Sequence, residues 1–181
     1  MIPEYNTANM QDWIEKLEAG QEILLTGKIF AARDAVHKKW MWLLKNGEKL
    51  PISFANTGIY YTGTTPSRED MPIGSCGPTT SLRMDSYYSI LANEGLRLTI
   101  GKGTRSDEVK ALIMQTKGVY LCAIGGAGAL YANCVKESKV LLYEELGCEA
   151  LRELTVEHFP LFVGIDSRGA SIFDSKYKGE I

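Results

Sequence analysis

The feature that most constrains this chain is an alternation of helix-like and strand-like segments between residues 80 and 132. Apolar residues recur at helical spacing in some of these segments and form short unbroken runs in others. In chain order, the patterns predict a helix from 80 ended by Gly95, a strand 96–100, a helix 107–116 capped by Ser106, a strand 119–124 and a helix 127–132. Such alternation is typical of a parallel sheet, so we expect an α/β fold.

The segments on either side of this alternation are of other kinds. Toward the N-terminus the patterns predict a short helix 13–19, a strand 22–32 with a bulge at Gly27, a helix 34–45 capped by Asp34, strands 52–54 and 59–62, and an ordered loop 63–79. Toward the C-terminus they predict short antiparallel strands at 140–143, 151–156, 161–166 and 171–173. We expect the 181 residues to form one domain, because domains average about 150 residues.

Charge and cysteine content exclude several classes of protein. The chain has 20 Lys and Arg against 22 Asp and Glu and no basic cluster, so we expect no nucleic-acid binding. An uncharged stretch at 118–135 contains four glycines, which suit turns better than a membrane span. The chain begins without a signal-peptide pattern, and its four cysteines form no Cys-x-x-Cys pair, so we expect a cytoplasmic protein that binds no metal.

The strongest candidate site is the segment 77–85, Gly-Pro-Thr-Thr-Ser-Leu-Arg-Met-Asp. Glycine and proline lead here into a predicted helix N-terminus, whose free N–H groups and dipole attract anions. Thr79 and Arg83 lie four positions apart and can face the same side, and the Arg83 guanidinium fits a carboxylate. The alternative is a plain helix cap, with a solvated Arg83 paired with Asp85 or Glu94.

Two other segments place polar residues at the ends of predicted strands. Lys102 follows a strand directly, at the edge where open α/β sheets bind ligands, although an exposed turn lysine would give the same pattern. Arg33 lies at a strand-to-helix junction, where its side chain can point into the same crevice. Asp34 can orient His37 three positions on, while a purely structural or solvated His37 is the alternative.

A glycine pattern at 126–131 imitates a dinucleotide-binding fingerprint. The third glycine position is Tyr131, which is too large for close packing of the helix on the strand. We therefore expect a tight turn at Gly125 and Gly126 near the crevice, and keep a dinucleotide enzyme only as a remote alternative.

Taken together, these motifs resemble the β subunit of the iron–sulfur hydro-lyases of the class I fumarase and L-tartrate dehydratase family. The resemblance runs from about Gly20 to Gly169. The segments that carry it are 26–27, 32–34 with 37–38, 59–63, 77–81 with 83–84, 101–103, 124–127 and 156–160. The variants at 64–66 and 104–106 look more like fumarase than tartrate dehydratase.

This resemblance implies a fold and a division of labour. The family's fold for this part is a swivelling β/β/α domain of three layers, with a central parallel sheet and a second, antiparallel sheet. In the two-subunit enzymes, a partner α subunit ligates a 4Fe–4S cluster, of which one iron acts as Lewis acid on the substrate hydroxyl. We expect the cluster on that partner, because the cysteines of this chain are scattered and Cys76 has no companion.

The resemblance also implies roles for single residues. Arg33 and Arg83 match the family's clamps for substrate carboxylates. Thr79 matches the threonine proposed as the base that takes the proton from carbon, and Lys102 the lysine placed to stabilise its alkoxide. The general acid would come from the partner chain. The residues expected to support this group are His37, Asp34, Thr80 and Gly125.

The expected function is that of a fumarate hydratase β subunit acting in a hetero-oligomer with the α subunit. The same clamps would serve tartrate or mesaconate, so an L-tartrate dehydratase or a related dicarboxylate dehydratase is the first alternative. A non-catalytic module that binds dicarboxylates is the second, and neither the oligomeric order nor dimerisation follows from the sequence.

Overall fold

The computed structural model describes residues 1–67 and 71–174, so residues 68–70 of the predicted loop and 175–181 of the predicted domain lie outside it. Its strands are β1 (Glu4–Asn6), β2 (Glu22–Ala31), β3 (Ile59–Tyr60), β4 (Leu98–Gly101), β5 (Val119–Cys122), β6 (Val135–Leu142) and β7 (Leu151–Ile165). Its helices are α1 (Asp34–Lys45), α2 (Asp85–Asn93), α3 (Asp107–Thr116) and α4 (Gly128–Asn133). Short 3-10 turns cover η1 (Thr7–Asp12), η2 (Ile14–Lys16), η3 (Ser81–Met84) and η4 (Glu144–Glu149).

The strands form one sheet in the order β1-β2-β3-β4-β5-β7-β6. Strands β1 to β5 run parallel to one another, which confirms the parallel sheet predicted from the alternation. Strand β7 runs antiparallel to β5, to β6 and to the whole of β2. Because β2 and β7 pair with each other as well as with the parallel strands, the antiparallel part is continuous with the parallel part, in one sheet rather than two.

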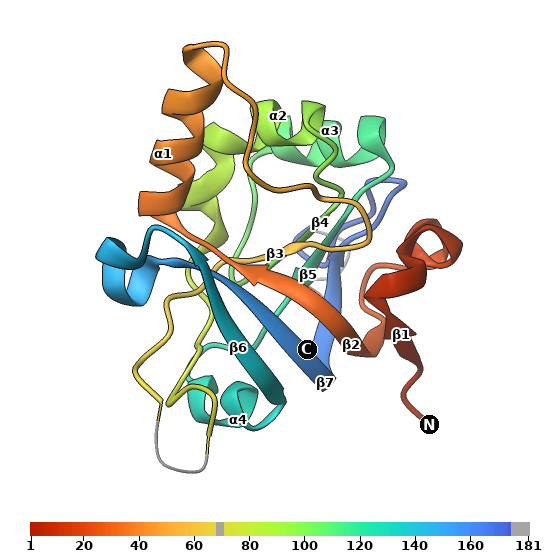
Figure 1. Cartoon of the computed structure of the whole chain (residues 1–181). Helices are drawn as coiled ribbons and strands as arrows, with labels where there is room; N and C mark the ends of the chain where they lie inside the picture. Colours follow the sequence, from red (N-terminus) through yellow and green to blue (C-terminus); the bar gives the residue numbers. More distant parts are fainter. Residues whose placement is uncertain (68–70, 175–181) are drawn as a thin grey trace.

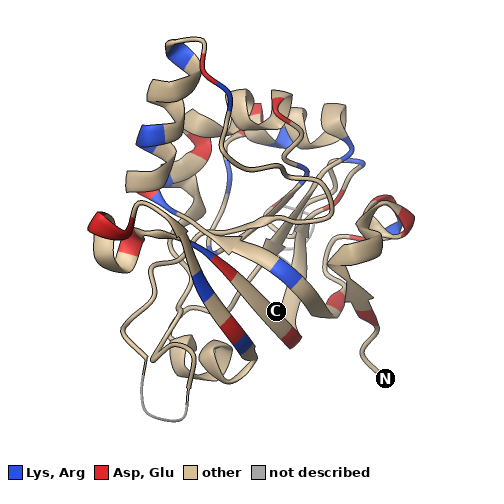
Figure 2. Cartoon of the chain, in the orientation of Figure 1, with Lys and Arg blue, Asp and Glu red and all other residues tan. Residues whose placement is uncertain are grey.

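Apolar side chains cover both faces of the sheet. One core includes Trp40, Leu91 and Ile113 of α1, α2 and α3, and the other includes Ile14 of η2 and Tyr131 of α4. Figure 1 shows α1, α2 and α3 together on one side of the sheet and α4 on the other. Buried on both faces, the central strands β3, β4 and β5 carry no charged residue, and the charges gather on the helices and the outer strands (Figure 2).

Two predictions for the N-terminal part are wrong. Residues 13–19 form no α-helix: the chain makes the two 3-10 turns η1 and η2, and Trp13 between them has a φ of −128°, outside the helical range. The apolar side chains that suggested the helix are buried all the same, with Ile14 and Leu17 at 0% exposure. Residues 52–54 form no strand.

The C-terminal strands are longer and fewer than predicted. The segments 151–156 and 161–166 belong to the single strand β7, which is interrupted only locally at His158, where φ is +51°. Strand β6 begins at Val135, before the predicted start at 140. The prediction missed this part because exposed charged residues interrupt the apolar pattern there. The segment 171–173 contributes one isolated bridge to Ile165.

The bulge predicted at Gly27 is confirmed. The register of β2 against β7 shifts between Leu25 and Gly27, and the φ of Gly27 is +114°. A Cβ at this position would lie 2.2 Å from Oγ1 of Thr7, which in turn accepts a hydrogen bond from the Lys28 N–H (2.9 Å). Only glycine permits this close approach of η1 to the strand.

The segment 79–81 crosses beside the carboxyl end of β4. The Lys102 N–H donates to the Thr79 carbonyl (3.2 Å), and the Ser81 N–H donates to the Lys102 carbonyl (2.9 Å). Gly101 lies under the crossing, where a Cβ would be 2.0 Å from Oγ of Ser81 and 3.3 Å from the Thr79 carbonyl oxygen. The absence of a side chain at Gly101 therefore sets how closely this segment approaches β4.

A buried arginine fixes the helices behind this crossing. Arg105 is 8% exposed and pairs with Asp85 of α2 at 2.5 Å. Its guanidinium lies 5.0 to 5.5 Å from the ring centres of Tyr61, Tyr88 and Tyr120. Because removing one partner of a buried ion pair leaves an uncompensated charge, this contact ties α2 firmly to the end of β4.

His37 of α1 is also buried, at 0% exposure. Its Nδ1 lies 2.9 Å from the Arg33 carbonyl, which can only accept a hydrogen bond, so Nδ1 carries the proton. Its Nε2 has no hydrogen-bond partner in the described part of the chain. Burial lowers the pKa of His37 to about 4, so the ring is neutral in the folded protein at pH 7.

The neutral state of His37 predicts a pH dependence of stability. In the unfolded chain a histidine binds a proton below about pH 6.5, whereas folded His37 stays neutral down to about pH 4, so stability present above pH 6.5 is lost as the pH falls toward 4. Between pH 7 and pH 5 the wild-type free energy of unfolding should fall by about 1 to 2 kcal/mol more than that of His37→Gln. The exposed His158 provides the control, since His158→Gln should keep the wild-type loss; equal pH dependence in all three proteins would contradict the assignment.

The crossing over Gly101 gives a second prediction. Gly101→Ala should lower the free energy of unfolding by about 1 to 3 kcal/mol, because its methyl group overlaps Ser81. At Gly77 a Cβ would meet nothing closer than 3.6 Å, so Gly77→Ala should change stability by less than about 0.5 kcal/mol. Urea denaturation measures both, and an unaffected Gly101→Ala would show that the approach of residues 79–81 to β4 is not close.

Candidate active site

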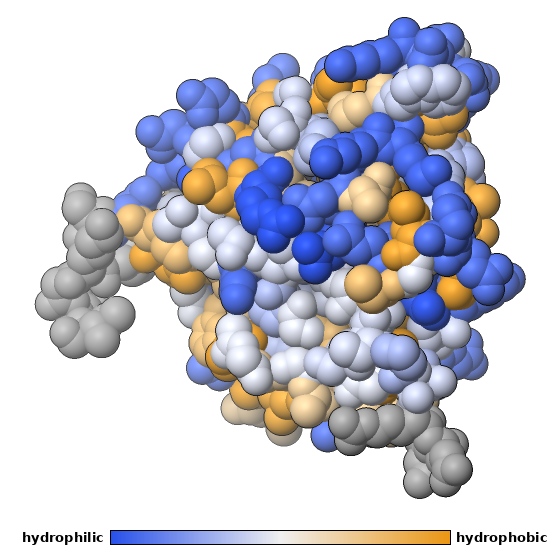
Figure 3. Space-filling model, turned by 90° about the vertical axis from the view of Figure 1, so that its left-hand side faces the viewer, coloured by the Kyte–Doolittle hydropathy of each residue, from blue (hydrophilic) through white to orange (hydrophobic). Residues whose placement is uncertain are grey.

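The candidate residues gather at the edge of the sheet where β2, β4 and β5 end. Arg33 follows β2, Lys102 follows β4 and Gly125 comes shortly after β5, and parallel strands present their carboxyl ends at one edge. The crossing segment brings Thr79 to the same edge. Figure 3 looks onto the side toward which β2 runs in Figure 1, and strongly hydrophilic side chains gather in the middle of that face.

Asp34 joins the two arginines predicted as clamps. Its Oδ2 accepts hydrogen bonds from Arg83 (2.7 Å) and from Nε of Arg33 (3.2 Å). The side chains of Arg33 and Asp34 are about a quarter exposed, and that of Arg83 is half exposed. Burial acts to raise the pKa of Asp34, but the hydrogen bonds from Arg83 and Arg33 outweigh it and hold that pKa below its usual value. The alternative partner of Arg83, Asp85, is taken by Arg105.

Glu149 supports this group, and sequence reasoning missed it. One of its carboxylate oxygens lies 3.4 Å from the Arg33 guanidinium, and the other accepts the N–H of Ala35 (3.0 Å) at the start of α1. Asp34, predicted as the cap of this helix, is instead its first residue, and the position before it makes no side-chain cap. Glu149 lies 114 positions after Ala35, and no local pattern marks it; only the pairing of β2 with β7 brings it here.

The backbone register places Thr80, rather than Thr79, directly opposite Lys102. Thr80 is exposed and Thr79 is 9% exposed, and the structure gives neither hydroxyl a hydrogen-bond partner among the described residues. The Lys102 side chain extends over Gly125, where a Cβ would lie 3.5 Å from its Cδ and 3.8 Å from its Nζ. Within the described part of the chain Lys102 forms no ion pair, so its ammonium group is free for a ligand.

The α-helix predicted to begin beside Thr79 does not begin there. The chain makes the 3-10 turn η3 first, and α2 begins only at Asp85. Thr80 precedes η3 without a capping hydrogen bond from its side chain. Positive charge at this edge therefore comes from side chains rather than from an α-helix dipole. His37 lies behind them, held by the Arg33 carbonyl and not by the Asp34 carboxylate as expected.

This arrangement suits an anionic ligand. Arg33, Arg83 and Lys102 stand against the carboxylates of Asp34 and Glu149, which leaves a surplus of positive charge. Partly exposed ion pairs such as these contribute only about 0 to 1 kcal/mol each. An incoming carboxylate can therefore replace Asp34 on the guanidinium groups at small cost, and its two oxygens could form the bidentate pair that arginine favours, which the single Oδ2 of Asp34 does not.

The described residues do not by themselves fit a metal cluster. In residues 1–67 and 71–174, no three His, Cys, Asp or Glu side chains come together in a way that could hold a metal ion. Cys76 is buried, which raises its pKa to about 12 and keeps it a neutral thiol, while Cys148 is exposed elsewhere. In the same ranges, no helix is long and apolar enough to cross a membrane.

The glycine pattern at 126–131 does not build a nucleotide loop. Helix α4 has only six residues, and its first residue, Gly128, is packed against Ser75 and Gly77. Tyr131, at the third glycine position, is buried, and its hydroxyl accepts the Ile124 N–H (2.7 Å). These contacts close the turn that a pyrophosphate would need.

Comparison with known proteins shows which family the chain resembles. The sequence profile of the family described as Fumarase C-terminus matches residues 4–176. The chain is 36% identical over 162 residues to Fumarate hydratase 2 of Leishmania major and 38% identical over 151 residues to the anaerobic class I fumarate hydratase of Escherichia coli (strain K12). These matches cover 88% and 82% of this chain but only 28% of either relative.

A third relative has nearly the same length as this chain. It is named "Putative L(+)-tartrate dehydratase subunit beta" of Methanocaldococcus jannaschii and is 38% identical over 180 residues, which covers 96% of this chain and 92% of that protein. The resemblance seen in the sequence is thus confirmed over almost the whole chain. The chain belongs to the Fumarase C-terminus family, whose members include the C-terminal part of class I fumarate hydratases and the β subunit of tartrate dehydratases.

Proposed function

We propose that this chain is the β subunit of an iron–sulfur-dependent hydro-lyase, a class I fumarate hydratase that interconverts fumarate and L-malate. The observation that carries the proposal is the convergence of Arg33 and Arg83, from distant parts of the chain, on the carboxylate of Asp34, at the sheet edge where β4 also ends. A substrate with two carboxylates matches this pair of guanidinium groups. The similarity to class I fumarate hydratases supports the choice of fumarate.

A tartrate dehydratase is the second candidate. The relative that this chain covers almost completely carries that name, and it is called a β subunit. Fumarate and tartrate both carry two carboxylates, so the clamps favour neither. Initial rates with the two substrates would separate these candidates, since a fumarate hydratase should convert fumarate and L-malate at least about tenfold more efficiently than tartrate.

Proton transfer in this proposal is carried out by Thr79 and Lys102. In the malate-to-fumarate direction the Thr79 side chain acts as the alkoxide, which takes the proton from the carbon next to a carboxylate and becomes the hydroxyl, and in the hydration direction the hydroxyl returns this proton. A threonine alkoxide needs a nearby cation, and Lys102 at the adjoining crossing supplies an unpaired ammonium group. Asp34 and Glu149 hold Arg33 so that the substrate carbon lies within reach, and the general acid comes from the partner chain.

The partner in this proposal is an α subunit that carries a 4Fe–4S cluster. Two observations support it: the chain spans only 28% of the Leishmania major and Escherichia coli fumarate hydratases described above, and no ligand set for a cluster forms among the described residues. Bound on the partner, the cluster would supply Lewis-acid chemistry for the substrate hydroxyl.

We further propose that the chain is one domain of the swivelling β/β/α type. Within the single hydrogen-bonded sheet, the parallel strands β2 to β5 would form the central layer, the strands β6 and β7, which pair back onto β2, the second layer, and α1 to α3 the third. A reducing, cytoplasmic setting accords with its four free cysteines.

The clamp assignment predicts a change in KM. In the complex assembled anaerobically with the α subunit, Arg83→Gln should raise KM for fumarate about 10- to 100-fold and change kcat much less, because the lost contact binds substrate and transition state alike. Arg168 is similarly exposed, at 55% against 52%, and Arg168→Gln should behave as wild type. An unchanged KM in Arg83→Gln would remove Arg83 from the clamp.

The proton-transfer assignment predicts a change in kcat. Thr79→Val and Lys102→Met should each lower kcat about 100-fold or more with little effect on KM, because both groups act on the transferred proton. Thr104→Val and Lys38→Met change exposed residues of the same types and serve as controls. Thr80→Val is the decisive comparison: a loss below about tenfold supports Thr79, while a larger loss than in Thr79→Val would transfer the role to Thr80, which the register pairs with Lys102.

A further inference from the structure

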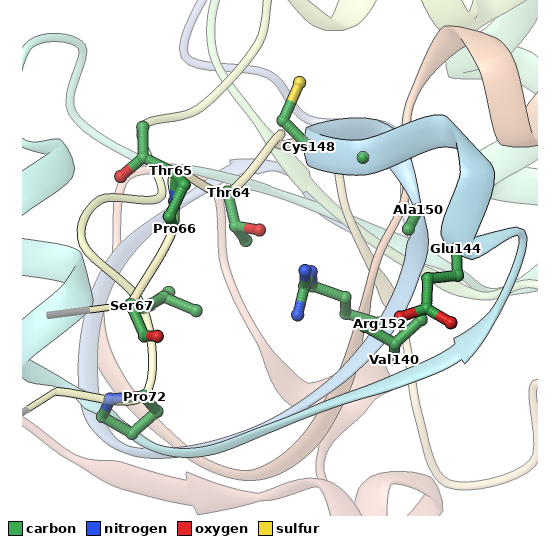
Figure 4. A pocket seen from close by; sticks show the side chains of 12 residues that line it. Thr64, Thr65, Pro66, Ser67, Pro72, Val140, Glu144, Cys148, Ala150 and Arg152 are labelled. Carbon is green, nitrogen blue, oxygen red and sulfur yellow. The ribbon is translucent and has the colours of Figure 1, made fainter.

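A separate cavity of about 450 Å³ lies between the loop that follows Thr62 and the strands β6 and β7. Its walls come from residues 64–67 and 72–73, from Val140 of β6, from Arg152 of β7, and from Glu144, Gly147, Cys148 and Ala150 in and next to η4. None of the four residues proposed to bind or convert the substrate lines it. Figure 4 shows the Arg152 guanidinium pointing into this cavity.

Arg152 is a partly buried cation that has no counter-ion among residues 1–67 and 71–174. The structure gives it no ion pair among the described residues, and its Nε is buried without a hydrogen-bond partner. The next residue on β7, Glu153, is taken by Lys28 at 2.9 Å. Because a charge withdrawn from water without a partner is costly, an anion that enters the cavity would be stabilised at this guanidinium.

Hydroxyl groups and apolar walls complete the cavity. Thr64 is 3% exposed and faces the cavity, with no hydrogen-bond partner for its hydroxyl in the described part of the chain. The exposed Thr65 and Ser67 also line the cavity. Ile73 and Ala150, both nearly buried, contribute apolar surface that an oxyanion alone would not require.

Glu144 stands at the rim of the cavity and forms no ion pair with Arg152. It is exposed on η4, so water screens its charge, but it still opposes the entry of an anion. Neutralising Glu144 should therefore strengthen anion binding rather than weaken it, which distinguishes a ligand site from an internal ion pair.

We propose that this cavity binds a small molecule that carries one oxyanion group, a carboxylate or a phosphate, held by Arg152 and the Thr64 hydroxyl, with a short apolar part against Ile73 and Ala150. The site goes beyond the proposed hydro-lyase reaction and does not depend on it. It shares a wall with the substrate clamp, since the Thr64 N–H donates to the carbonyl of Cys148 (3.1 Å), the residue before Glu149.

Amide spectra of the full ¹⁵N-labelled chain test this proposal, with inorganic phosphate and butyrate as probes and the ionic strength held constant with chloride. Saturable shifts of the Thr64, Thr65 and Cys148 amides are expected, with a dissociation constant of about 1 to 10 mM for at least one probe. Tighter binding of phosphate would identify a phosphate-bearing ligand, and tighter binding of butyrate a carboxylate with an apolar tail.

Four variants make the test specific. Arg152→Met should weaken binding at least about tenfold, Arg152→Lys less, and Glu144→Gln should tighten it about two- to threefold. Arg83→Gln leaves this cavity intact and should bind the probe as wild type. Unshifted amides in wild type, equal binding by Arg152→Met with an otherwise native spectrum, or shifts confined to the surroundings of Arg33 and Arg83 would each overturn the proposal.

Discussion

The antiparallel pairing of β2 with β7 holds the two ends of this chain together and determines where the functional residues lie. Residues Glu22 to Ala31 pair with Phe162 to Arg152, so the end of β2 meets the beginning of β7. Arg33 leaves β2 at this point and Glu149 comes just before β7, which explains their contact across more than a hundred residues. The same pairing places Arg152 opposite Ala31, at the cavity between the loop after Thr62 and the strands β6 and β7.

Buried contacts hold the backbone below the candidate site in place, whereas the ion pairs within the site can be replaced by a ligand. Below the site, Arg105, which is surrounded by tyrosines, pairs with Asp85 and fixes α2. The lack of a side chain at Gly101 lets the crossing segment 79–81 pack closely on β4. Such buried contacts are expensive to disturb. Above them, the ion pairs of Asp34 with Arg33 and Arg83 are partly exposed and contribute little to stability. Under the proposed function, a substrate carboxylate exchanges with Asp34 without disturbing the fold.

Local patterns in the sequence were sufficient for the elements whose stability is local. Helix 107–116 has its cap at Ser106, the bulge at Gly27 has a glycine, and the strands β3 to β5 are uncharged, so their periodicity and punctuation predict them well. Elements whose extent depends on contacts between distant segments were not predicted correctly. Strand β7 continues through His158 because β2 and β6 pair with it, and residues 13–19 bury their apolar side chains without a helix.

The candidate site divides in the same way. Arg33, Thr79, Arg83 and Lys102 each stand at a junction that the sequence marks, and the fold brings their backbones to one edge of the sheet. Three features depend on pairings between distant segments, so no local sequence pattern could predict them. They are the register of Thr80 with Lys102, the role of Glu149, and the charge of Arg152, which has no partner among the described residues.

The central claim is that this chain supplies half of a hydro-lyase site and a cluster-bearing partner the other half. The most direct measurement is the rate of L-malate formation from fumarate by this chain, by the α subunit with an intact cluster, and by an anaerobic mixture of the two. We predict no turnover by either chain alone and steady turnover by a stable complex of both. A stable complex that leaves fumarate unconverted and dehydrates tartrate would contradict the choice of substrate, and the absence of any complex would contradict the claim itself.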